Sequence, residues 1–165
     1  MVDSKVKYTA QDYLNLLWSE NVRYELIDGE LISHSGNTIL HQPVVENLLL
    51  SLSRSISQVN ELGTLFPGPH DTVLSNENML LPFLLFISGE RQSIITEANI
   101  QGALNLVIEV LAVNTAERDR GIKKNIYGRF GVKEYWIVDP AIRTIEVYEA
   151  GDMGLDFVRA YPEGT

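Results

Sequence analysis

Glu109 is the residue whose surroundings most strongly suggest chemistry. It interrupts the short apolar run Leu104–Leu111, which is bounded by polar residues and predicts a strand covered on both faces. A carboxylate in such a strand is costly to bury unless a partner compensates it. Buried acids with shifted pKa values are typical of functional sites, but a structural acid paired with Arg or Lys leaves the same pattern. Glu109 is therefore a candidate site residue, with a structural ion pair as the alternative.

A basic stretch follows this strand. Between Glu117 and Lys133, six lysine and arginine side chains stand against two acids, which leaves a local charge of +4 in a chain of formal net charge −9. Within this stretch, Lys123 lies four residues after Asp119, a spacing at which two side chains can pair on a helix. The stretch predicts either a surface that contacts phosphates or a solvated helix face with internal ion pairs.

Both candidates fall within a predicted strand–helix–strand unit. Thr115 is placed to cap a helix that runs to about Phe130, and Gly131 suits the position just after the helix end. The next apolar run, Tyr135–Val138, predicts a second buried strand. Two strands joined by a helix over about 35 residues are typical of a βαβ crossover.

The rest of the chain predicts a mixed α/β fold, because helical and strand patterns alternate along it. The expected elements are a short helix from Thr9 with Leu17 and Trp18 on its apolar stripe, a hairpin over Arg23–Ser33 around Asp28-Gly29, a long helix from Thr38 or His41 to about Asn60, strands over Thr64–Phe66 and Thr72–Leu74, a central strand over Met79–Ile87 that contains Pro82, and a terminal antiparallel pair over Thr144–Tyr148 and Leu155–Ala160.

Size and composition narrow the class of protein. The 165 residues predict a single domain over residues 1–165, and the absence of cysteine excludes disulfides and thiolate chemistry. No apolar run approaches membrane-spanning length and the N-terminus is not a secretory signal, so we expect no membrane partner and a cytoplasmic location. The net charge of −9 argues against sequence-independent nucleic-acid binding by the chain as a whole.

A set of short motifs recurs in a fixed order between Tyr8 and Tyr161. The motifs are Arg23–Glu30, His41 at the head of the long helix, Pro69–Leu74, Ile100–Ala103, Leu106–Leu111, Asn114–Lys123, Tyr127 and Gly131–Pro140. Each motif is weak alone, but the ordered set resembles the Uma-type family of restriction endonucleases, which is similar to the PD-(D/E)xK nuclease superfamily. The resemblance implies an α/β, restriction-endonuclease-like fold, with a mixed central β-sheet flanked by helices and an N-terminal hairpin.

The resemblance also implies Mg²⁺-dependent phosphodiester hydrolysis. Mg²⁺ is a hard cation that prefers carboxylate oxygens, and a nearby lysine can stabilise the charge that develops on the phosphate. Carried over by motif, Glu109 and Glu25 are the implied metal ligands and Lys123 is the charge-stabilising catalytic residue. Leu111 stands two residues after Glu109, where the wider superfamily has its lysine. Within the basic stretch, Arg118, Arg120 and Lys124 are the candidate nucleic-acid contacts, with a solvated helix face as the alternative.

One departure from the family pattern affects the metal site. The Pro-Asp motif falls on Pro82-Phe83, so an aromatic ring stands where one of the principal metal carboxylates is expected. Because few protein ligands hold Mg²⁺, this replacement predicts weak or absent metal binding. Asp71, on the preceding predicted strand, is the candidate substitute.

The resulting prediction is an Mg²⁺-dependent DNA endonuclease with a degenerate metal site, with DNA as partner and a homodimer that pairs two basic patches. The alternative is a non-catalytic nucleic-acid-binding or protein-interaction module on the same scaffold, and a third possibility is an inert fold. The first two differ in whether Glu109, Glu25 and Lys123 converge on an open pocket or are sealed by Phe83.

Several candidates have simpler explanations. Glu25 could be a solvated acid at a hairpin edge. His41 could be a helix-start residue that donates to a neighbour, and His70 an exposed loop histidine. Tyr127 and Trp136 could be aromatic residues of the core.

Overall fold

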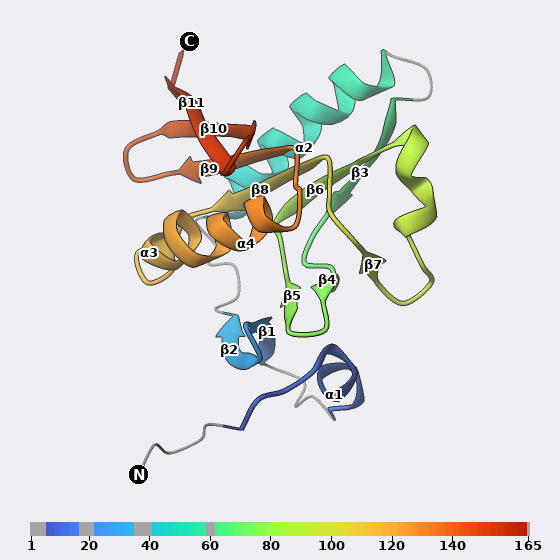
Figure 1. The fold of residues 1–165 in the computed structure, drawn as a ribbon. Coiled ribbons are helices and arrows are strands. Elements are labelled where there is room, and N and C mark those ends of the chain that lie inside the picture. The colour runs from blue at the N-terminus through green and yellow to red at the C-terminus, as the bar shows by residue number, and fades with distance from the viewer. Residues whose placement is uncertain (1–5, 17–21, 35–40, 59–61, 165) are drawn as a thin grey trace.

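The computed structural model describes residues 6–16, 22–34, 41–58 and 62–164. It is a mixed α/β structure with two mixed β-sheets and few helices, so the predicted α/β class is confirmed, with two sheets in place of one central sheet (Figure 1). The helical segments are α1 Ala10–Asn15, α2 Gln42–Ser57, a 3₁₀ helix Gly89–Ile94, α3 Ala116–Arg118, a π-helical turn Asp119–Lys123 and α4 Lys124–Arg129.

The two sheets differ in size and in the parts of the chain that they contain. The five-stranded sheet has the order β2-β1-β5-β4-β7, with β1 Arg23–Ile27, β2 Glu30–His34, β4 Thr72–Ser75, β5 Asn78–Leu80 and β7 Ile100–Gln101. The six-stranded sheet has the order β11-β10-β9-β8-β6-β3, with β3 Gly63–Pro67, β6 Leu84–Ser88, β8 Leu106–Val110, β9 Glu134–Asp139, β10 Thr144–Gly151 and β11 Gly154–Pro162.

The N-terminal predictions are confirmed where the structure describes them. Thr9 caps α1 in a capping box with Asp12. Leu17 and Trp18 lie outside the described residues. The hairpin β1–β2 turns at Asp28 and Gly29, which have φ angles of 46° and 80°, as a tight two-residue turn requires.

The apolar run Met79–Ile87 is two strands, so the prediction of one central strand is wrong. Its first part is β5 in the smaller sheet, and its second part is β6 in the larger sheet. Pro82 lies between them, where the missing N–H of proline removes no ladder hydrogen bond. This buried crossing joins the two sheets directly.

Helix α2 begins after His41, and Pro43 occupies its first turn, where proline is tolerated. The alternative start at Thr38 and the predicted end at Asn60 lie outside the described residues. The apolar stripe of α2 packs on one face of the larger sheet, against a cluster that includes Leu84, Ile108 and Val138. Of the helices in the described ranges, none has the length and apolar character needed to cross a bilayer.

The βαβ unit is confirmed, because β8 and β9 are parallel neighbours joined by a helical segment. That segment is irregular, since a π-helical turn interrupts it between α3 and α4. Gly131 follows α4 with a φ angle of 83°, which matches the predicted position after the helix end. Thr115 precedes α3, but its hydroxyl accepts from the N–H of Ala112 rather than from the helix.

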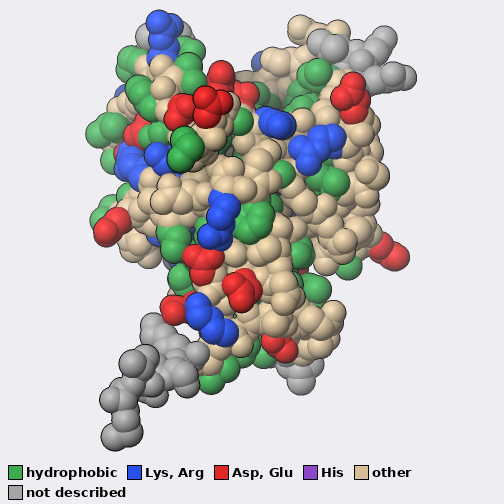
Figure 2. Space-filling model, in the orientation of Figure 1, with side chains coloured by type: hydrophobic (Ala, Val, Ile, Leu, Met, Phe, Trp, Pro, Cys, Tyr) green, Lys and Arg blue, Asp and Glu red, His purple; other side chains and the backbone are tan. Residues whose placement is uncertain are grey.

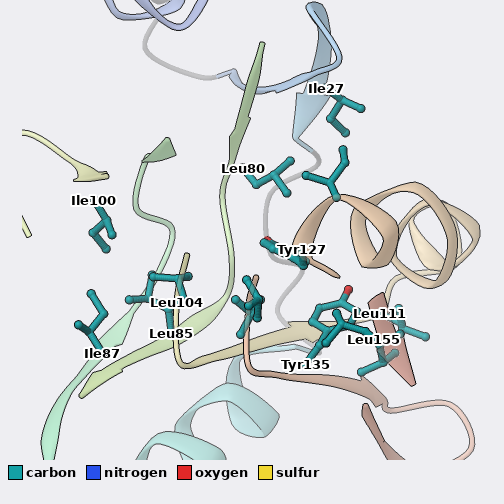
Figure 3. Close-up of a cluster of buried hydrophobic side chains, with 14 residues drawn as sticks. Ile27, Leu80, Leu85, Ile87, Ile100, Leu104, Leu111, Tyr127, Tyr135 and Leu155 are labelled. Atoms are coloured by element: carbon teal, nitrogen blue, oxygen red, sulfur yellow. The ribbon is translucent and has the colours of Figure 1, made fainter. Parts of the chain in front are cut away.

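The largest hydrophobic cluster draws on both sheets and on α4. Figure 3 shows Ile27 and Leu80 of the smaller sheet, Leu85 of the larger sheet and Tyr127 of α4 as members of this cluster. The candidate site residues therefore lie where the two sheets and the helix meet.

Candidate active site

The three predicted catalytic residues come together in the structure. Glu25 comes from β1 of the smaller sheet, Glu109 from β8 of the larger sheet, and Lys123 from the π-helical turn. Lys123 Nζ lies 2.6 Å from Glu109 Oε1 and 2.7 Å from Glu25 Oε1. A single ammonium group thus joins two carboxylates that are 84 positions apart in the sequence and belong to different sheets.

The cluster is sealed from solvent. The exposed fractions of Glu25, Glu109 and Lys123 are 0%, 0% and 1%. Glu25 is therefore not the solvated hairpin-edge acid that its sequence position allowed. It lies on β1 between β2 and β5, and its Oε1 accepts a hydrogen bond from the backbone N–H of Leu81 at 3.0 Å.

Tyr127 holds Glu109 from the helix side. Its hydroxyl donates to Glu109 Oε1 at 2.9 Å, so this oxygen receives both a hydroxyl and an ammonium. The other oxygen, Oε2, is buried and has no hydrogen-bond partner among the described residues. Tyr127 is therefore a core aromatic, as expected, but its hydroxyl also contacts the candidate site.

Asp119 is a member of this cluster that the sequence interpretation did not assign to the site. Its Oδ1 lies 3.7 Å from Lys123 Nζ and 3.9 Å from Arg118 Nε, and its side chain is 3% exposed. Its backbone carbonyl accepts from the hydroxyl of Tyr135 at 3.0 Å. The available signal was the four-residue spacing from Lys123, which predicted the pair but not its burial.

The charges of the cluster explain the pKa of Glu109. Arg118 also approaches the cluster, with its guanidinium 3.7 Å from Glu25 Oε2. Two cations then balance Glu25 and Asp119, and the carboxyl group of Glu109 is in excess. Burial, and secondly the carboxylates of Asp119 and Glu25, raise the pKa of Glu109 to about 8, against the opposing effect of Lys123.

Lys123 remains a cation. Burial lowers the pKa of an ammonium group, but the carboxylates of Glu109, Glu25 and Asp119 outweigh burial here and raise the pKa of Lys123. The cluster is therefore a buried salt-bridge network in which Lys123 is the central positive charge.

This arrangement does not fit a Mg²⁺ ion. In the described parts of the chain, no three acidic or histidine side chains are arranged to hold a metal. The position between Glu25 and Glu109 is occupied by the ammonium of Lys123, which already compensates both groups. Mg²⁺ also keeps several waters in its coordination shell, for which this sealed cluster has no exposed face.

Phe83 does not seal the cluster. Phe83 comes directly before β6. The antiparallel register pairs Leu84 with Ile108, and its extension by one residue sets the backbone of Phe83 opposite that of Glu109. Its ring, however, packs with the α2 cluster and lies 6.2 Å from the ring of His41, on the other side of the larger sheet. The side chains of Lys123 and Tyr127 contact the carboxyl group of Glu109.

Asp71 and the two histidines have contacts with residues outside the cluster. Asp71 Oδ1 accepts from the hydroxyl of Tyr13 at 3.3 Å, so the structure offers no support for Asp71 as a substitute ligand. His41 is buried, and its Nε2 lies 2.9 Å from the carbonyl oxygen of Leu111. Because a carbonyl only accepts, Nε2 is the donor, as expected of a helix-start histidine. His70 is exposed in a loop.

The predicted nucleic-acid contacts are largely engaged within the chain. Arg120 forms ion pairs with Asp139 at 2.9 Å and with Glu146 at 2.7 Å. Arg118 approaches the buried cluster, and Lys124 Nζ lies 4.8 Å from the centre of the Tyr148 ring. Figure 2 shows basic and acidic side chains interspersed on the face that it presents. The structure therefore favours the interpretation of a helix face with internal ion pairs.

Comparison with known proteins agrees with this fold. The fold is similar to that of the crystal structure of a "putative nuclease belonging to DUF820" from Anabaena variabilis, with a TM-score of 0.72. The two chains are 17% identical, and the match covers 94% of this chain and 84% of the other. At this identity the match establishes the fold alone.

Residues 10–164 match the model of the Uma2 family, described as "Putative restriction endonuclease". The chain belongs to this family, so the resemblance in its sequence motifs is confirmed. No curated protein matches the chain.

Proposed function

We propose that the chain has a restriction-endonuclease-like fold and is a cleavage-deficient member of a DNA endonuclease family. In this proposal the ammonium of Lys123 takes the place of the divalent cation that phosphodiester hydrolysis would need. The observation that carries the proposal is the position of Lys123 Nζ, 2.6 Å from Glu109 and 2.7 Å from Glu25, in a cluster with no exposed face.

Two physical arguments support loss of cleavage. A substrate phosphate cannot approach Glu109 or Lys123 while both are buried. General acid–base catalysis requires the catalytic side chain to lie at hydrogen-bond distance from the reacting group. A metal ion would also have to displace an ammonium that two carboxylates hold, and the acid expected at position 83 is absent. Glu25, Glu109 and Lys123 then act as structural residues that tie β1 to β8.

DNA is the partner class that we propose for this fold, with weak binding by this chain. The net charge of −9 opposes approach to phosphates, and the ion pairs of Arg120 compensate one of the candidate contacts. Lys124 is the remaining candidate for a phosphate contact. It is half-buried against Tyr148, and among the described residues no carboxylate forms an ion pair with it.

Cleavage of supercoiled DNA with Mg²⁺ or Mn²⁺ tests the proposal. We expect the wild-type protein to nick DNA no faster than Glu109→Ala. Phe83→Asp is the matched variant, because it restores the acid that the family pattern has at this position. Since the side chain at position 83 lies on the α2 side of the larger sheet and Lys123 still occupies the buried cluster, we expect no metal-dependent nicking there either. Phe83→Asn, similar in size but uncharged, is the control.

Circular dichroism confirms that both variants at position 83 are folded before activity is compared. Metal-dependent nicking by the wild type that disappears in Glu109→Ala would contradict the proposal. Metal-dependent nicking by folded Phe83→Asp that is absent in Phe83→Asn would show that the missing acid at position 83, and not the burial of the cluster behind Lys123, prevents cleavage.

A further inference from the structure

Strand β11 is a long edge strand with an exposed surface. It is nine residues long and ends the six-stranded sheet, with β10 as its neighbour on one side (Figure 1). Phe157, Val158 and Tyr161 are 58%, 50% and 42% exposed. The outer backbone groups of an edge strand can pair with a further strand, and natural proteins usually block such pairing.

The hairpin β10–β11 also carries charges that the chain does not compensate. Glu149 lies directly opposite Asp156, and like charges at this position repel each other. Among the described residues, neither these carboxylates nor Arg159 form an ion pair, and the Arg159 guanidinium lies 5.8 Å from the centre of the Tyr161 ring. The hairpin thus carries the exposed acid Glu149 on β10, and the exposed acid Asp156 and the exposed base Arg159 on the edge strand β11.

These charges are complementary to those of a second copy of the same strand. If two copies of β11 lie antiparallel with Phe157 opposite Val158, then Asp156 falls opposite Arg159 of the second copy. A two-fold axis repeats each contact, so the pairing forms two Asp–Arg pairs and two apolar pairs. Each Arg159 then lies near the repelling carboxylates of Glu149 and Asp156.

A β-bulge in β11 places Asp156 and Arg159 on the same face of the sheet, since their partners on β10, Glu149 and Val147, are two residues apart. The β10–β11 ladder pairs Val147 with Arg159 and Tyr148 with Phe157, which leaves Val158 as the extra residue of a β-bulge. Val158 therefore lies beside the proposed two-fold axis, with half of its surface exposed. The carboxylate of Asp156 leans over Gly151, and as an exposed side chain it can change rotamer to reach the second copy.

We infer that two copies of the chain associate through β11 as a homodimer, with Asp156 of each copy paired to Arg159 of the other. The net charge of −9 on each copy opposes association, so the contact depends on this local complementarity. The inference does not depend on the catalytic state of the buried cluster.

Sedimentation equilibrium with charge-reversal variants tests the inference. We expect the wild-type protein to sediment as a dimer at about 100 µM, a concentration that populates even a weak specific complex. Arg159→Asp places an aspartate opposite Asp156 at both symmetry-related contacts, and the repulsion should raise the dissociation constant at least about tenfold. The double variant Asp156→Arg/Arg159→Asp exchanges the two charges and should restore the dimer.

Arg54→Asp on the exposed side of α2 is the matched control, because it changes the net charge equally at a distance from β11. It should leave the dissociation constant unchanged. A monomeric wild type, an Arg159→Asp variant that dimerises normally, a double variant that stays monomeric, or an equal loss in Arg54→Asp would each overturn the inference.

Discussion

The buried cluster around Lys123 and the hairpin β10–β11 differ in whether their charged side chains are buried and paired within the chain. In the cluster, Lys123 and Arg118 meet three acidic side chains inside the protein, and nothing is exposed at Glu25 or Glu109. In the hairpin, Asp156 and Arg159 are exposed and find no partner of opposite charge among the described residues. The difference indicates that family membership alone does not tell which charged residues act on other molecules. Burial and pairing within the chain tell more.

The largest expected effect is on the buried side of this comparison. Lys123→Met should lower the free energy of unfolding by about 3–5 kcal/mol, because it leaves buried carboxylates without their central cation. Chemical denaturation measures the change. Lys124→Met is the matched control, because Lys124 is the next residue in the chain and is half-buried with its ammonium over the Tyr148 ring. This variant should lower the free energy of unfolding by less than about 1 kcal/mol. Equal losses in the two variants would show that the cluster has no special weight.

The next effect concerns pH. The pKa of Glu109 is raised to about 8, so the folded protein binds a proton that the unfolded chain releases above its ordinary value near 4.5. The contribution of Glu109 to stability is therefore full below about pH 4.5 and is lost as the pH rises to about 8. Its slope is at most about 1.4 kcal/mol per pH unit.

Glu109→Gln isolates this contribution, because glutamine resembles the protonated acid in shape and keeps an acceptor for Tyr127. Denaturation of both proteins across the pH range should show the variant without the decline that the wild type has. Parallel pH profiles would mean that Glu109 is ionised in the folded protein.

A smaller effect is expected from Tyr127→Phe. The variant keeps the ring in the core but removes the hydroxyl that donates to Glu109 at 2.9 Å. The expected loss is about 1–3 kcal/mol, the cost of a missing buried hydrogen bond. Tyr148→Phe removes a half-buried hydroxyl that donates to Glu146 at 2.8 Å, and it should cost less. The reverse order would contradict the importance of the buried cluster.

The smallest effect on stability is expected on the exposed side. Arg159→Asp should change the unfolding free energy of the monomer by no more than about 0.5 kcal/mol, as surface substitutions usually do. Denaturation at a concentration well below the dimer dissociation constant measures this. A large loss would mean that Arg159 supports the fold of its own chain.

Local patterns predicted much of the fold because local chemistry decides it. The Asp28-Gly29 turn, the Pro43 start of α2 and the crossover to β9 all follow from spacing along the chain. The division of Met79–Ile87 between two sheets was missed, because an apolar run does not show which sheet its two ends join. The family resemblance, and the position of Glu109 as the only acid in an apolar strand, identified it as a candidate site residue.

Contacts between distant segments could not be predicted in the same way. The sequence shows neither that Glu25 and Glu109 share one ammonium nor that Arg120 faces two strands that follow it in the chain. Which way the Phe83 ring turns also depends on packing against His41 and α2. These contacts decide between a working site and a structural cluster.

The central claim is that Lys123 occupies the position of the cation in this protein. Calorimetric titration of Mg²⁺ into the folded wild-type protein tests it most directly. We expect no saturable binding at millimolar Mg²⁺. Saturable binding of one equivalent that disappears in Glu109→Ala would contradict it, because a metal would then share the carboxylates with Lys123.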